Sequence, residues 1–96
     1  MADTLTRYES ATNTSITVGA TTTTVLAAGG GRQVVVLTND SDEAIYLGIG
    51  GAAVMNKGIR LNASGGAYEI NGTNAGTAVI NAICASGSKN LCVMYA

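Results

Sequence analysis

The chain has 96 residues, a formal net charge of −1, and no His, Trp, Phe or Pro. A chain of this length forms one domain. General acid–base and nucleophilic catalysis need side chains that titrate near neutral pH. Without His, the chain has few such side chains. The five basic residues are scattered, whereas nucleic-acid binding needs clustered positive charge. We therefore expect neither enzymatic activity nor a cofactor, and no nucleic-acid partner.

The composition favours β-structure. Thr, Val and Ile supply 27 of the 96 residues and Gly supplies 13, which are residues of strands and turns. Aromatic residues make up only 4% of the chain, so we expect a small core and modest stability of a single protomer. Oligomerisation commonly stabilises such small domains. No apolar run approaches the ~20 residues of a spanning helix, and the N-terminus lacks the apolar stretch of a signal peptide. We expect a soluble protein made in a cytoplasm, with no membrane contact.

Residues 1–14 are polar and show little apolar periodicity, so we interpret them as an extended arm that precedes a domain at 15–96. Two readings of the arm remain open. It is either a frayed terminus or a segment that docks on a neighbouring subunit, with Leu5 and Tyr8 as anchors.

Strand signals follow at short spacing. Strands are expected at 15–18, 21–28, 32–38 and 44–49, with an unbroken apolar run at Val34–Leu37 that is typical of a strand covered on both faces or lying at an interface. The last two strands look like one β-hairpin. Its turn, 39–43, is rich in Asp and Asn, and either a solvated turn or a hard-cation site would use these residues.

The second half of the chain continues this pattern. Residues 52–57 form a loop or one helical turn, in which Val54 and Met55 are candidate docking residues. Short strands are expected at 59–61 and 67–70, with a turn at 71–74 that begins Asn-Gly. A closing hairpin is expected from strands at 77–85 and 91–95.

Seven or eight short strands, separated by turn signals every ~8–12 residues, predict an all-β domain. The expected architecture is an antiparallel β-sandwich or a jelly-roll-like barrel.

The two cysteines, Cys84 and Cys92, fall on the strands of the predicted closing hairpin. Pairing Ala85 with Leu91 would place them opposite each other, with Cβ atoms about 4.5–5.5 Å apart. Two alternatives remain for this pair of cysteines: two buried free thiols or a disulfide bond. A zinc site would need more ligands than two Cys supply.

Several segments together resemble small virion proteins of tailed bacteriophages. The first is Arg32 followed by an apolar run, a polar turn of the form Asn-x-Ser-Asp at 39–42, and Ile-Tyr-Leu-Gly at 45–48. Further matches are Gly58–Leu61, Gly65-Gly66, Tyr68–Ile70 and the ending from Ala78 to Val93. The resemblance covers residues from about 15 to about 95. The two Cys lie outside the pattern.

The resemblance implies a β-sandwich, often trimeric, on the outside of a virion. The expected function is that of a capsid decoration (cement) protein, which is synthesised in the host cytoplasm and binds the major capsid protein. The alternative is a tail- or fibre-associated module that contacts another virion protein or a host glycan, with exposed Tyr and Asn as the contact residues.

Overall fold

The computed structural model describes residues 11–29, 33–71 and 78–96, and these residues form strands and loops without a helix. None of the described segments is a helix of the length and apolarity that crossing a membrane requires. The strands are β1 (Thr12–Val18), β2 (Thr23–Leu26), β3 (Val35–Asn39), β4 (Ile45–Ile49), β5 (Ile59–Leu61), β6 (Ala67–Ile70), β7 (Ile80–Cys84) and β8 (Lys89–Tyr95).

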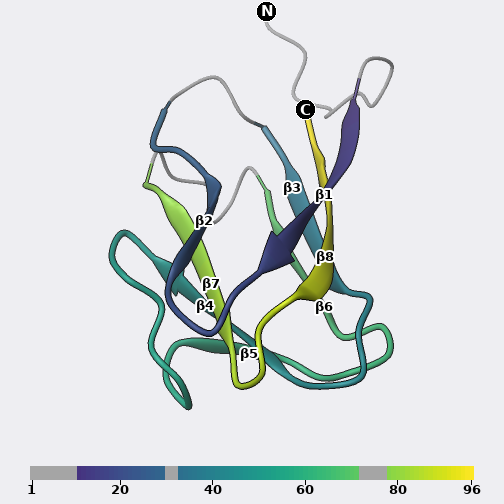
Figure 1. The fold of residues 1–96 in the computed structure, drawn as a ribbon. Coiled ribbons are helices and arrows are strands. Elements are labelled where there is room, and N and C mark those ends of the chain that lie inside the picture. Colours follow the sequence, from purple (N-terminus) through teal and green to yellow (C-terminus); the bar gives the residue numbers. More distant parts are fainter. Residues whose placement is uncertain (1–10, 30–32, 72–77) are drawn as a thin grey trace, which may run out of the picture.

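Two antiparallel four-stranded sheets pack face to face (Figure 1). Sheet A has the order β1-β8-β3-β6, and sheet B has the order β2-β7-β4-β5. Most consecutive strands therefore lie in different sheets, as in the eight-stranded, double-sheet jelly roll. The expected all-β sandwich class is confirmed.

Both predicted hairpins are wrong. β3 pairs with β6 and β8 in sheet A, while β4 pairs with β5 and β7 in sheet B. The chain likewise changes sheets between β7 and β8. The four strands β3, β4, β7 and β8 occupy the centres of the sheets, where each has a hydrogen-bonded neighbour on both sides. Among the described strands, only β4 and β5 are consecutive and pair with each other.

The start of the first strand differs from expectation, whereas residues 52–57 adopt one of the two expected forms. β1 begins at Thr12, so residues 12–14, which were assigned to the arm, pair with Val93–Tyr95 of β8. Thr and Asn can extend a strand when a partner accepts their backbone hydrogen bonds, whatever their polarity. Residues 52–57 form a loop with a turn and no helix, closed by a hydrogen bond from Lys57 N to Val54 O (3.1 Å).

The core lies between the sheets and consists of aliphatic side chains. Successive side chains of a strand point to opposite faces of the sheet, so every second residue contributes to the core. The buried members are Val18, Val35, Leu37, Ile45, Leu47, Leu61, Ile70, Ile80, Ala82, Cys84, Leu91 and Val93.

Candidate contact surfaces

The outer face of sheet B is covered by the β4–β5 connection, residues 50–58, which we call the covering loop. Its Ala53, only 4% exposed, packs on Tyr46 and Ile83, and Met55 lies against the same cluster. These contacts form a second small core on a face that an antiparallel sandwich commonly leaves to water.

Backbone geometry and hydrogen bonds hold the covering loop in place. Ala53 N donates to Thr22 Oγ1 (2.9 Å), and Asn81 Nδ2 donates to Gly51 O (2.6 Å). Gly48 lies beneath the loop, where a Cβ would come within 2.8 Å of Ala52 O. The close approach of loop and strand therefore requires Gly at this position.

The loop and the strand end before it carry exposed apolar side chains. Val54 is 49% exposed and Ile49 is 45% exposed, and these are the exposed large hydrophobic residues among the described part of the chain. Val54, a predicted docking residue, is thus available for contact, whereas Met55 is half-buried against the sheet. Ile49 alternates in step with Ile45 and Leu47, but it is the last residue of β4 and lies outside the main core.

The outer face of sheet A differs from that of sheet B. Cross-strand rows on this face run Ser15–Cys92–Thr38 and Asn13–Met94–Val36. No outward residue of β1, β3 or β8 is charged. A hollow of about 480 Å³ lies over these rows, and a second of about 610 Å³ extends from Thr38 and Cys92 toward the β3–β4 connection.

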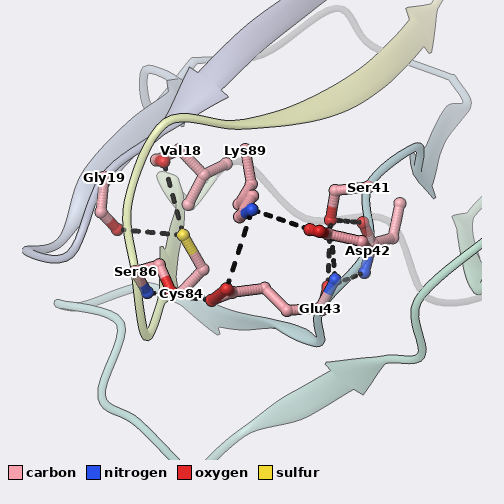
Figure 2. Close-up of polar contacts among 9 residues, drawn as sticks. Val18, Gly19, Ser41, Asp42, Glu43, Cys84, Ser86 and Lys89 are labelled. Carbon is pink, nitrogen blue, oxygen red and sulfur yellow. Dashed lines mark hydrogen bonds and ion pairs between the residues drawn. The ribbon is translucent and has the colours of Figure 1, made fainter.

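One end of the sandwich is joined by a polar cluster (Figure 2). Lys89 Nζ lies 2.7 Å from Asp42 Oδ1 and 3.9 Å from Glu43 Oε1. Glu43 Oε2 also accepts a hydrogen bond from Ser86 N (2.9 Å). The β3–β4 connection is thereby tied to the β7–β8 turn and to the start of β8.

These contacts change the acidity of the groups in the cluster. The hydrogen bond and charge of Lys89 lower the pKa of Asp42 below its ordinary value of 3.8. Hydrogen bonding to Ser86 lowers the pKa of Glu43 below 4.5. The hydrogen bond to Asp42 raises the pKa of Lys89 above 10.5. The cluster is therefore ionised across the neutral range, which suits a structural ion pair rather than proton transfer.

The polar segment 39–43 is organised around a buried amide. Asn39 is fully buried, and its Nδ2 donates to Glu43 O (2.8 Å) and Leu61 O (2.9 Å). Its Oδ1 accepts from Ser41 Oγ (2.6 Å). Within the described ranges, no group of three or more His, Cys, Asp or Glu side chains is placed to hold a metal ion.

The predicted juxtaposition of Cys84 and Cys92 is wrong, and both thiols are free. Cys84 pairs with Ile45 and points into the core, where its Sγ lies 3.4 Å from Val18 O (Figure 2). Cys92 pairs with Ser15 and Thr38 and lies half-buried on the outer face of sheet A. The two residues belong to different sheets because the chain changes sheets between β7 and β8.

The tyrosines do not form an exposed contact face in the described part of the chain. Tyr46 is 8% exposed beneath the covering loop, and the Arg60 guanidinium lies 5.9 Å from its ring centroid. Tyr68 and Tyr95 are partly buried against the main core. The predicted anchors Leu5 and Tyr8 lie outside the described residues.

The sequence missed Ile49 and the cluster around Lys89. Gly50-Gly51 directly after Ile49 was the available signal, because a strand that stops there leaves its last side chain at the sheet margin. No local sequence pattern links Lys89 to Asp42, which lies 47 residues earlier.

The chain was compared with protein-family models, curated proteins and solved structures, and none of them matches it.

Proposed function

We propose that this protein is a non-enzymatic capsid decoration (cement) protein of a tailed bacteriophage. It binds the outside of the assembled shell as a trimer and contacts neighbouring major capsid subunits. The sequence resemblance supports the proposal, and so does the jelly-roll strand order, since viral capsid domains use that fold.

The observation that carries the proposal is the pair of exposed apolar side chains at the β4–β5 connection. Val54 and Ile49 are both nearly half exposed. Val54 projects from a loop that several hydrogen bonds fix to sheet B. An apolar side chain on a rigid support loses little conformational entropy when a partner covers it. We assign the docking contact to this segment.

The mechanism of stabilisation is mass action. A protein that binds the assembled shell but not its separated subunits stabilises the assembled state in proportion to RT ln(1 + [L]/Kd). At a free concentration about 100 times Kd, this stabilisation is about 2.7 kcal/mol per site. Such a role needs complementary surfaces and no reactive side chain.

The test uses shells assembled from the major capsid protein of the same phage without this protein. Purified wild-type protein is expected to bind them and raise their melting temperature. Absence of binding would contradict the proposed function. Localisation on tails rather than heads by labelled electron microscopy would instead support the tail-associated alternative.

A matched pair of variants tests the docking segment separately. Val54→Asp is expected to weaken shell binding at least tenfold, since it would bury an unpaired charge. Ala63→Asp, at an exposed site in the β5–β6 turn, is the control and is expected to bind like wild type. Equal binding by both variants would preserve the function and refute this docking surface.

A further inference from the structure

The sandwich has four sheet edges, and three of them carry features that discourage pairing with another chain. β5 has three residues with Arg60 at its centre. β2 has four residues and an irregular register between Thr24 and Leu26. β6 has four residues and includes Glu69.

The fourth edge, β1, has none of these features. It is seven residues long, matched in length only by β8 among the described strands, and contains no charge and no Pro. Its residues from Thr12 to Ser15 and Thr17 are exposed. One side of β1 pairs with β8, and no other described strand pairs with its second side. A long, uncharged, regular edge of this kind is a template for strand addition.

We propose that the second side of β1 pairs antiparallel with β1 of a second copy of this chain. The two-fold axis passes through Ser15, perpendicular to the sheet, and joins the two A sheets into one continuous sheet. The paired segment is Asn13–Thr17. Val18 lies at its margin, because it is buried and its carbonyl oxygen faces the Cys84 thiol.

The side chains of β1 are complementary to themselves in this register. Ser15 faces Ser15 of the second copy, and Asn13 faces Thr17, so small hydrogen-bonding groups meet on the outer face. On the inner face Thr14 meets Ile16, which is only partly buried in one copy. No like charges oppose each other, and like charges directly opposite destabilise a strand pair. The register therefore sets no charged side chain of β1 against another.

The pairing gives an isologous contact, which closes after two copies. It involves a different surface from the docking segment, so it does not depend on the proposed function. When a separate three-fold contact is also present, as in the proposed trimer, the smallest closed assembly holds six copies. A five-residue strand pair is a small interface, so association is expected at micromolar concentrations or above.

Cross-linking through engineered cysteines tests the register. The parent is Cys92→Ser, because Cys92 neighbours Ser15 within one chain and Cys84 is inaccessible. Adding Ser15→Cys places two thiols opposite each other, and mild oxidation is expected to yield mostly covalent dimer. Thr17→Cys, which would face Asn13, and Ala67→Cys, on the opposite edge of sheet A, are controls expected to stay monomeric on a non-reducing gel.

A folded Ser15→Cys protein that forms no more dimer than the controls would overturn the proposal. Sedimentation of the unmodified protein provides an independent measurement. A mass of two or six copies supports the two-fold contact, and one or three copies at the highest soluble concentration contradicts it. Ser15→Lys is expected to weaken the dimer at least tenfold, whereas Ala67→Lys is expected to leave it unchanged.

Discussion

Asn39 shows how one buried polar residue shapes this fold. It ends β3, and its side chain bonds the β3–β4 connection and the backbone of β5. Its backbone accepts from Gly65 N (2.8 Å) and donates to Gly66 O (2.7 Å). In the resemblance to phage virion proteins, Asn39 is the first residue of the polar turn motif. The structure gives that residue a structural role, because it fixes the point at which the chain leaves sheet A for sheet B.

Replacing Asn39 by Ala is expected to lower the free energy of unfolding by about 2–4 kcal/mol. The Leu61 and Glu43 carbonyl groups each lose a hydrogen bond from the amide, and Glu43 O keeps only the one from Ser41 Oγ. Asn62→Ala, at an exposed site, is the control and is expected to change it by less than about 0.5 kcal/mol. Urea denaturation measures both values. Similar effects in the two variants would mean that the buried amide has no special role.

At the scale of elements, the covering loop explains why sheet B can be apolar on both faces. All five residues of β7 are buried, including the outward-facing Asn81 and Ile83. Asn81 donates to Gly51 O, and Ile83 packs against the loop. The loop is positioned by hydrogen bonds to Thr22, directly before β2, and to Asn81 of β7, so the exposure of Val54 depends on residues far away in the sequence.

Gly48→Ala is expected to displace the covering loop, because the added Cβ would overlap Ala52 and Ala53. A cost of about 1–3 kcal/mol is typical of such overpacking. Near-UV circular dichroism of Tyr46 and thermal unfolding would report the change. Gly51→Ala is the matched control, since its Cβ would meet no atom within 4 Å. A stable Gly48→Ala protein with unchanged tyrosine signals would contradict the assigned position of the loop.

At the scale of the whole molecule, the cluster around Lys89 holds the two sheets together at one end. Asp42 and Glu43 precede β4 in sheet B, while Lys89 begins β8 in sheet A. At the same end, Cys84 N donates a hydrogen bond to Gly19 O (3.1 Å), which joins β7 to the β1–β2 turn. The Cys84 thiol lies 3.5 Å from the same oxygen (Figure 2).

The stability of the fold is therefore expected to depend on pH at both extremes. The folded-state pKa values of Asp42 and Glu43 are lowered, so their contribution is present above pH 4.5 and is lost as the pH falls below their ordinary values of 3.8 and 4.5. The pKa of Lys89 is raised, so its contribution is present below pH 10.5 and is lost above it.

Thermal unfolding as a function of pH measures this dependence. Lys89→Met should remove the alkaline limb and flatten the acid limb in part. Asp42 loses the partner that lowers its pKa, whereas the pKa of Glu43 is lowered mainly by hydrogen bonding to Ser86. Lys57→Met, at an exposed residue of the covering loop, is the control and should leave both limbs in place. An unchanged profile in Lys89→Met would show that the cluster does not couple the sheets.

The sequence by itself determined the class of this fold and most of its strands. Thr, Val and Ile content, alternation and Gly-rich turns are local properties, and they located Ile59–Leu61 and Ala67–Ile70 at their observed bounds. Only the tertiary structure decided which strands pair. Short connections predicted a hairpin with its turn at 39–43 and a closing hairpin from 77–85 and 91–95. In the structure β3, β4, β7 and β8 are central strands, and most of their neighbours come from distant parts of the chain. The separation of Cys84 from Cys92, the covered face of sheet B and the open edge of β1 all follow from that non-local choice, which no local pattern encodes.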